Sequence, residues 1–304
     1  MSTGFIVDAF LGERYRTPTF LFLVGNFRRW DVDDYYQDKI AVVTGGAAGL
    51  GRELCLELGL RGATVVAVDV DQEGAEAVCQ TIRTGGGNAL AAYLDVTIFE
   101  NAQRIVKDVV GKYGRIDLIF NNAGTALHGE TRDLGVEHWR TVLDVNLMGV
   151  IYGAISAYGQ MVKQGAGQIV NIGSLAGLIP VPKEIPYCTS KWAVVGFTSS
   201  LRLEGAGLGV KVNLVCPGIM RTAIHQTVDY VNVDQERLVR PQTKHFVQPT
   251  QAARLILDQV AQNRPLIIFP FYARLIWWLY RFNPAIFNLL FRKMLRDFRK
   301  LRLP

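Results

Sequence analysis

One segment, Lys39–Gly51, constrains the fold of this 304-residue chain more than any other. Its first part, Ile40–Val43, is a short β-branched apolar run, which is typical of a strand buried in a parallel sheet. A glycine-rich turn follows, and Arg52–Leu60 then has the composition of a helix. A strand, a glycine turn and a helix in this order predict the start of a dinucleotide-binding unit, because the helix N-terminus offers free N–H groups to a pyrophosphate.

The glycines of this turn are spaced Thr44-Gly45-x-x-x-Gly49-x-Gly51, with three residues between the first two. Because glycine lets the backbone approach a pyrophosphate closely, we expect the phosphates at Gly45, Gly49, Leu50 and Gly51. The spacing differs from G-x-G-x-x-G, and a glycine motif by itself is a weak signal. A glycine-rich turn in another kind of α/β protein is the alternative at this point.

The region Lys39–Pro270 alternates apolar strands with helical segments, which predicts a Rossmann-type α/β fold with a doubly wound parallel sheet. No repeat or low-complexity linker divides it, so we interpret residues 39–270 as one domain, residues 1–38 as an N-terminal extension and residues 271–304 as a C-terminal tail. The expected strands are Ile40–Val43, Ala63–Val68, Ala89–Leu94, Ile116–Phe120, Gln168–Ile172, Lys211–Val215 and Leu266–Phe269. The expected helices include Arg52–Leu60, Ala75–Arg83, Ala102–Tyr113 and a long one over Asp133–Gly159.

The net charge of +6 is concentrated in the tail, where Phe271–Pro304 carries eight Lys and Arg residues and one acid, Asp297. The rest of the chain is close to neutral, which argues against nucleic-acid binding. The four cysteines have no C-x-x-C spacing, and the four histidines have no ligand spacing. We therefore expect no metal site and no disulfide framework, and we expect a reducing compartment such as the cytoplasm.

Asp69 ends the second expected strand. An acid at this position accepts hydrogen bonds from ribose hydroxyls, and its charge repels a 2′-phosphate. Neither Gly46 nor Val70 supplies a basic side chain that could bind such a phosphate. The sequence therefore predicts NAD rather than NADP, and the alternative is that Asp69 is an ordinary turn residue.

A candidate catalytic group follows the fifth expected strand. Ser174 comes first, and Tyr187 and Lys191 follow at a spacing of four, which places both on one face of a helix. A free phenol with a pKa near 10 is a poor base at neutral pH. We expect the Lys191 ammonium to lower the pKa of Tyr187, although a tyrosine and a lysine four residues apart also occur by chance on many helices.

These motifs resemble those of the short-chain dehydrogenase/reductase family. They occur in the family's order over about Lys39–Phe269: the Thr44–Gly51 loop, Asp69, Asp95, Asn121-Asn122-Ala123-Gly124, Asn146, Ser174, Tyr187-x-x-x-Lys191 and Cys216-Pro217-Gly218. The resemblance implies a Rossmann domain with its active site at the carboxyl edge of the sheet. It also implies a homodimer or homotetramer.

The resemblance further implies a role for each matching residue. Tyr187 would be the general acid/base, Lys191 would tune Tyr187 and hold the nicotinamide ribose, and Ser174 would orient the substrate oxygen. Asn146 would anchor a water relay, and Asp95 and Val96 would lie near the adenine. Further cofactor contacts would come from Asn122, Ala123, Gly124, Pro217, Gly218, Ile219 and Thr222.

The predicted function is hydride transfer between NAD and a hydrophobic secondary alcohol or ketone, such as a long-chain, sterol, retinoid or aryl alcohol. Two alternatives stay open: an epimerase or dehydratase of similar architecture, and a redox-sensing or scaffold protein that binds NAD without turnover. Met220–Val247 is expected to form a mobile substrate lid. The mostly apolar candidates for the pocket wall are Leu127, His128, Leu178, Ile179, Pro180, Val181, Ile185 and Pro186.

The tail has its own pattern. Its apolar residues Phe287, Leu290, Phe291, Met294, Leu295 and Phe298 recur at helical spacing on one face, and basic residues take the others. Such a helix suits an anionic membrane surface, whereas Phe271–Phe282 is apolar but too short to span a bilayer. We expect peripheral membrane association, and the alternative is packing on the domain or across a dimer interface. For Met1–Asp38, packing on the domain, a membrane interface and a start codon placed too far upstream all stay open.

Overall fold

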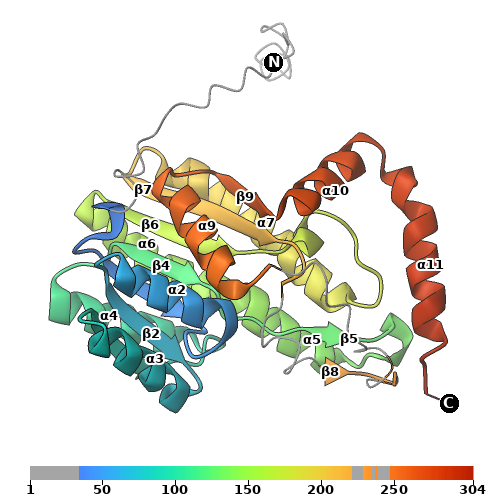
Figure 1. The fold of residues 1–304 in the computed structure, drawn as a ribbon, viewed down its shortest axis with the longest axis horizontal. Helices are drawn as coiled ribbons and strands as arrows, with labels where there is room; N and C mark the ends of the chain where they lie inside the picture. The colour runs from blue at the N-terminus through green and yellow to red at the C-terminus, as the bar shows by residue number, and fades with distance from the viewer. Residues whose placement is uncertain (1–33, 221–228, 235–236, 238–246, 304) are drawn as a thin grey trace, which may run out of the picture.

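The computed structural model describes residues 34–220, 229–234, 237 and 247–303. Its centre is a seven-stranded sheet with helices on both faces (Figure 1). All strand pairs in this sheet are parallel, and the order is β3-β2-β1-β4-β6-β7-β9. The strands are β1 (Ile40–Thr44), β2 (Thr64–Asp69), β3 (Asn88–Tyr93), β4 (Leu118–Asn121), β6 (Gly167–Ile172), β7 (Val210–Pro217) and β9 (Leu266–Phe269).

The strand order reverses between β1 and β4. The chain first builds outward through β2 and β3, and then in the other direction through β6, β7 and β9. The predicted doubly wound Rossmann-type fold is therefore confirmed, and in such a sheet ligands bind at the carboxyl edge beside the reversal. The helices of this body are α2 (Gly49–Leu60), α3 (Gln72–Thr84), α4 (Phe99–Tyr113), α5 (Val136–Leu143), α6 (Gly149–Gln164), α7 (Ile185–Gly205) and α9 (Pro249–Ala261).

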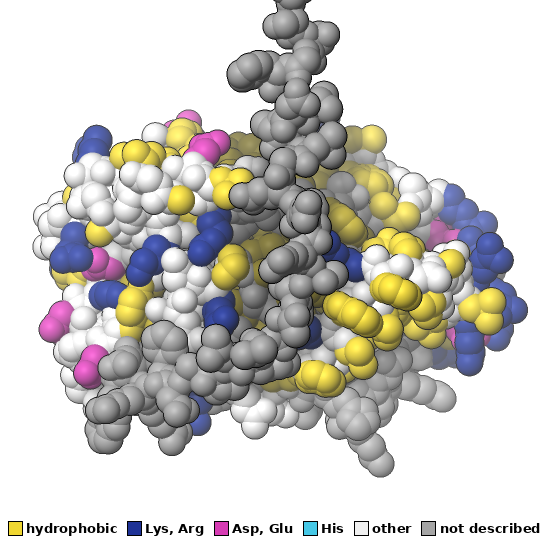
Figure 2. Space-filling view, turned by 90° about the horizontal axis from the view of Figure 1, so that it is seen from above, with side chains coloured by type: hydrophobic (Ala, Val, Ile, Leu, Met, Phe, Trp, Pro, Cys, Tyr) yellow, Lys and Arg dark blue, Asp and Glu magenta, His cyan; other side chains and the backbone are white. Residues whose placement is uncertain are grey.

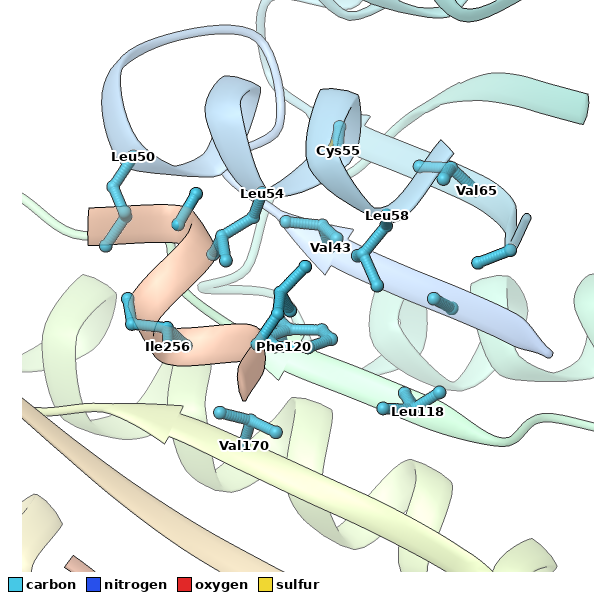
Figure 3. Close-up of a cluster of buried hydrophobic side chains, with 14 of the residues drawn as sticks. Val43, Leu50, Leu54, Cys55, Leu58, Val65, Leu118, Phe120, Val170 and Ile256 are labelled. Carbon is cyan, nitrogen blue, oxygen red and sulfur yellow. The ribbon is translucent and has the colours of Figure 1, made fainter. Parts of the chain in front are cut away.

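Two apolar clusters attach these helices to the sheet. Helices α2, α3 and α9 cover one face, and Figure 3 shows Leu54 of α2 and Ile256 of α9 close to Phe120 of β4. Helices α4, α6 and α7 cover the other face. Because the strands other than the edge strand β3 are buried on both faces, they are nearly continuous apolar runs, which is why they could be predicted from the sequence.

The long helix predicted over Asp133–Gly159 runs instead over Val136–Gln164, and it contains a five-residue π turn at Asp144–Met148. The predicted end was wrong because Gly159 is an exposed residue inside α6, where a glycine costs about 1 kcal/mol without ending the helix. Gly165, in the left-handed conformation with φ 65°, ends it. Among the described helices, this one alone is long and apolar enough to cross a membrane, and it packs on the sheet as a core helix.

Two further differences concern the ends of the body. Helix α9 has no counterpart among the predicted elements, although Ile256 and Leu257 on it are fully buried. Residues Asp34–Tyr36, within the region interpreted as an N-terminal extension, form a 3-10 turn. Tyr36 is fully buried there, and its hydroxyl donates to the carbonyl oxygen of Leu257 at 2.7 Å. These residues therefore pack as part of the body.

Thr222, most of the predicted lid Met220–Val247 and residues 1–33 lie outside the described residues. At the edges of that lid region, Met220 and Val247 form a parallel bridge. A second small sheet pairs β5 (Leu127–His128) with β8 (Asp229–Tyr230). This pair brings Tyr230 next to His128.

The C-terminal tail forms an arch beside the body (Figure 1). Helix α10 (Phe271–Phe282) leaves from the end of β9, a 3-10 turn at Pro284–Phe287 reverses the chain, and α11 (Asn288–Arg299) returns toward β5 and β8. Trp277 packs into an apolar cluster with Leu178 and Ile179, which follow β6. The arch therefore has an inner face that packs on the body.

Candidate active site

The glycine turn between β1 and α2 forms a backbone cradle at the carboxyl edge of the sheet. Gly45 has φ 66°, where a side chain would be strained, and a Cβ at Gly51 would overlap the carbonyl oxygen of Gly45. Within the described residues no side chain caps α2, because Ala48 is its N-cap. Uncapped N–H groups next to glycines fit the phosphates of a dinucleotide, and the predicted Gly49 and Leu50 lie in this first turn.

Hydrogen bonds fix the segment after β4 to this turn. The Thr44 hydroxyl accepts from the N–H groups of Asn122 at 2.9 Å and Ala123 at 3.0 Å. The Asn122 side-chain amide donates to the carbonyl oxygen of Thr44 at 2.9 Å. Thr44 is not among the predicted site residues, and its signal in the sequence is a hydroxyl at the end of a buried apolar strand.

Asp69 and Asp95 lie near the ends of neighbouring strands. Asp69 accepts from the N–H groups of Ala47 at 3.0 Å and Asp71 at 3.1 Å, one on each carboxylate oxygen. Asp69 thus lies beside the glycine turn with lone pairs left for ribose hydroxyls. One oxygen of Asp95 accepts from the N–H and the hydroxyl of Thr97, at 2.9 and 2.7 Å, which is a local turn contact.

Asn146 lies in the π turn between α5 and α6 and is fully buried. Its side-chain oxygen accepts from the N–H of Thr125 at 2.8 Å, and its amide donates to the carbonyl oxygen of Thr125 at 2.8 Å and to the Ser190 hydroxyl at 3.4 Å. A Cβ at Gly124 would lie 3.2 Å from the Asn146 oxygen. Asn146 therefore joins the segment after β4 to helix α7, and single π turns are frequent at functional sites.

Ser174, Tyr187 and Lys191 come together at the carboxyl edge. Tyr187 and Lys191 are on α7, and Ser174 follows β6. The Tyr187 phenol forms a hydrogen bond with Ser174, and the Lys191 ammonium lies 5.6 Å from the centre of the Tyr187 ring. Lys191 is buried and donates to the carbonyl oxygen of Ile172 at 2.9 Å.

The protonation of this group differs from the prediction. Burial raises the pKa of Tyr187 to about 12, although the hydrogen bond with Ser174 lowers it. Burial also lowers the pKa of Lys191 to about 8. The expected net lowering of the Tyr187 pKa is therefore not found for the protein's own groups, because lost hydration outweighs the hydrogen bond with Ser174.

The end of β7 borders the same edge. Pro217 ends the strand, and the Gly218 N–H donates to the carbonyl oxygen of Phe269 at 2.7 Å. The Ile219 N–H donates to the hydroxyl of Tyr272, on α10, at 3.1 Å. Of the predicted cofactor contacts, Pro217, Gly218 and Ile219 therefore lie at the end of the strand next to β6, which Ser174 follows, and the first turn of the tail touches them.

A polar cluster that the sequence analysis missed lies just before α7. His128 Nδ1 lies 3.0 Å from Glu184 Oε1, and the Lys183 ammonium lies 3.4 Å from the same oxygen. The His128 ring stacks on Tyr230, with ring centres 5.2 Å apart. Burial raises the pKa of Glu184, but His128 and Lys183 outweigh this effect and leave the pKa below its ordinary value. A carboxylate therefore lies three residues before Tyr187.

Comparison with known proteins agrees with this geometry. A family model described as short chain dehydrogenase matches residues 39–231, most of the body. The chain belongs to the short-chain dehydrogenase family. The predicted family is therefore confirmed, and this short-chain dehydrogenase is an oxidoreductase that acts on alcohol or ketone groups with a nicotinamide cofactor.

Two curated relatives and one solved structure illustrate how similar this chain is to other proteins of the family. An NAD-dependent glycerol dehydrogenase from Listeria innocua is 31% identical over 243 residues, which cover 79% of this chain and 94% of that protein. A cyclohexanol dehydrogenase from an Acinetobacter species is 35% identical over 192 residues, which cover 62% of this chain and 76% of that protein. The crystal structure of a short-chain dehydrogenase/reductase from Burkholderia phymatum in complex with NAD has a TM-score of 0.74 and 26% identity, covering 83% of this chain and 96% of that chain.

Proposed function

We propose that this short-chain dehydrogenase transfers hydride between NAD and a hydrophobic secondary alcohol or ketone, with Tyr187 as the general acid/base. The observation that carries the proposal is the meeting of Ser174, Tyr187 and Lys191 at the sheet edge that also holds the glycine turn. When bound, the oxidised nicotinamide supplies the hydride acceptor and one positive charge. That charge favours the phenolate, which the protein's own groups disfavour.

In alcohol oxidation, the Tyr187 phenolate takes the hydroxyl proton, and Ser174 holds the same oxygen as it becomes a carbonyl. In ketone reduction, the Tyr187 phenol returns the proton to the carbonyl oxygen. Lys191 stabilises the phenolate by charge and, as a further part of the proposal, holds the nicotinamide ribose. Asn146 is a positioning residue, since its described bonds go to Thr125 and Ser190 rather than to the proton-transfer groups.

Asp69 supports NAD over NADP. Its hydrogen bond from the Ala47 N–H holds the carboxylate beside the glycine turn, where it would repel a 2′-phosphate. The next residue, Val70, is exposed and brings no cation to this place. The Listeria relative is NAD-dependent by name, and the Burkholderia structure contains NAD. We propose that Asp95, Val96 and the Asn122–Gly124 segment complete the cofactor site.

A hydrophobic substrate is supported by the side chains around Tyr187. Leu127 is buried beside the polar cluster, and Ile185 and Pro186 lie in the turn of α7 that leads to Tyr187. Leu178 and Ile179 are buried against α10, so they lie behind the proposed pocket wall and do not form its surface. Cyclohexanol, the substrate named for one relative, is a hydrophobic secondary alcohol, whereas glycerol, named for another, is polar.

We also propose a cytoplasmic homodimer or homotetramer that associates peripherally with an anionic membrane surface. All four cysteines are free and buried, as is common in a reducing compartment. Exposed apolar side chains on α6 and α7, among them Ile155, Trp192 and Leu203, offer a surface for a second copy. The basic tail supports the membrane association, and the near-neutral body supports the absence of a nucleic-acid partner.

The proposal is tested by NADH formation with sterol, retinoid, long-chain, aryl and cyclic alcohols, with glycerol as the polar comparison and NADP as the second cofactor. We expect kcat/KM to be at least about tenfold higher for a hydrophobic alcohol with NAD than for glycerol. Tyr187→Phe should abolish turnover and keep NAD binding, and the control Tyr113→Phe, on α4, should change neither. A preference for glycerol would reject the substrate class, and turnover in Tyr187→Phe would reject the mechanism.

A further inference from the structure

The C-terminal arch presents large apolar side chains to solvent. On α10 these are Phe271, Leu275, Trp278 and Phe282, which recur every three or four residues and so share one helix face. Ile286 and Leu289, which follow α10, are exposed too, and we call these six exposed residues the outer stripe. Figure 2 shows hydrophobic side chains gathered on this side of the molecule, next to a group of Lys and Arg.

The outer stripe is not the apolar face that the sequence pattern indicated. Phe287 and Phe298, which belong to the predicted membrane face, are buried, and Phe291 packs into the cluster under α10. The tail therefore uses most of that face to hold itself on the body, although Leu290 on it is 57% exposed. The outer stripe is additional apolar surface, and Phe282 and Leu289 on it are 77% and 81% exposed.

Basic side chains border the outer stripe. Arg274 and Arg281 lie along one side of it on α10, and Arg292, Lys293 and Arg296 follow on α11, all of them exposed. The sequence has no acid between Phe271 and Arg296. This combination fits an anionic bilayer, where apolar and aromatic side chains enter the headgroup region and cations meet lipid charges.

A second copy of the chain fits this surface poorly. A two-fold interface places the same patch against itself. The cations beside the stripe would then face one another, and the tail has a single acid, Asp297, to offset them. Charge complementarity therefore favours lipid over self-association.

The arch is held at both ends, so the outer stripe has a fixed place relative to the active site. At its start, the Tyr272 hydroxyl accepts from the Ile219 N–H at the carboxyl edge. At its end, Arg299 pairs with Glu130 at 2.7 Å and Arg302 pairs with Asp133 at 2.6 Å. We call these two ion pairs the clasp. Arg302 also forms an antiparallel bridge with Val233.

We propose that the outer stripe docks on an anionic bilayer and holds the carboxyl edge of the sheet close to the lipid from which a hydrophobic alcohol or ketone enters. The docking deepens the proposed membrane association by naming its surface, and the entry of substrate from lipid rests on the proposed hydride transfer. The docking residues are the outer stripe and the cations beside it. The clasp keeps this surface attached to the substrate side of the body.

The test is sedimentation of the full chain with phosphatidylcholine vesicles that contain phosphatidylglycerol, compared with phosphatidylcholine alone. The test variant is Phe282→Glu/Leu289→Glu. The control is Leu60→Glu, because Leu60 on α2 is also 77% exposed but lies outside the arch. We expect the wild type and the control to bind the anionic vesicles, with binding weakened by salt, and the test variant to bind at least about tenfold less.

Absence of wild-type binding to the anionic vesicles would overturn the proposal, and so would unchanged binding of the test variant. If vesicle binding is absent and the test variant instead changes the oligomeric mass in light scattering, the stripe is a contact between copies and the proposal fails. Oxidation of cyclohexanol without vesicles tests the proposed function separately. Loss of that reaction with vesicle binding intact would reject the function and leave the docking standing.

Discussion

Arg299, at the end of α11, donates to Glu130 at 2.7 Å, although 169 residues separate the two in sequence. The same carboxylate also accepts from Arg132 at 2.6 Å. Close by, the Lys183 ammonium lies 5.6 Å from the ring centre of Phe298 and pairs with Glu184, three residues before Tyr187. The last helix therefore contacts the segment that leads into α7, and we expect changes in it to alter substrate binding.

The clasp can be removed without touching the catalytic group. Arg299→Ala/Arg302→Ala should release the end of α11, because Glu130 and Asp133 lose their tail partners. Hydrogen–deuterium exchange should rise in α11, and KM for a bulky hydrophobic alcohol should change while kcat for cyclohexanol stays constant. The matched control is Arg296→Ala/Lys300→Ala, whose side chains are exposed on the same helix end. Unchanged exchange in α11 of the clasp variant would show that apolar packing alone holds the arch.

Alcohol oxidation should accelerate with pH. Burial raises the pKa of Tyr187 to about 12, so the phenol keeps its proton near neutrality, whereas oxidation needs the phenolate. Below the operating pKa, kcat/KM for oxidation should rise by about tenfold per pH unit, and ketone reduction, which uses the protonated phenol, should stay flat. Ser174→Ala removes the hydrogen bond that lowers this pKa and should move the oxidation profile to higher pH. Initial rates in both directions measure this, and a flat oxidation profile would argue against Tyr187 as the base.

Asp69 should set the choice of cofactor. Asp69→Ser/Val70→Arg removes the repulsion and adds a phosphate partner at the end of β2, so the ratio of kcat/KM values should shift toward NADP by about tenfold or more. Steady-state kinetics with both cofactors measure the ratio. The control is Asp108→Ser, which removes an exposed carboxylate on α4 and so tests the loss of one negative charge away from the cofactor. A wild-type enzyme that already prefers NADP would show that Asp69 has another role.

Gly51 should tolerate no side chain. In Gly51→Ala the new Cβ meets the carbonyl oxygen of Gly45, and α2 can move away only by opening the phosphate turn. We expect weaker NAD binding and a free energy of unfolding lowered by about 2 kcal/mol. In Gly159→Ala the Cβ meets nothing within 4 Å, so this helix-interior change should instead stabilise, by about 1 kcal/mol. Urea unfolding measures the stability of both variants, and NADH titration measures their cofactor binding. Equal effects of the two substitutions would contradict the idea that the turn has no room for a side chain at Gly51.

Much of the body could be predicted because its signals are local. A strand covered on both faces must be apolar along its whole length, and so β1, β4 and β9 were found to within two residues. The apolar segment noted at Phe271–Phe282 coincides with helix α10, which Pro270 and Pro284 flank. By contrast, α9 and the π turn at Asn146 were missed. Helix α9 does bury residues at helical spacing, among them Ala252, Ile256 and Val260, so its signal was present in the sequence and was overlooked. A one-residue insertion in a helix, by contrast, leaves no periodic signal of its own.

The sequence by itself determined the order of strands and helices, the family motifs and the helical spacing that brings Tyr187 and Lys191 together. Tertiary structure alone decided the sign of the pKa shift of Tyr187, because burial depends on what surrounds the phenol and not on its spacing from a lysine. It also decided which apolar face of the tail is buried. Both α10 and α11 carry more apolar residues than one contact needs, and the tail buries Phe287 and Phe298 while it leaves the outer stripe in solvent.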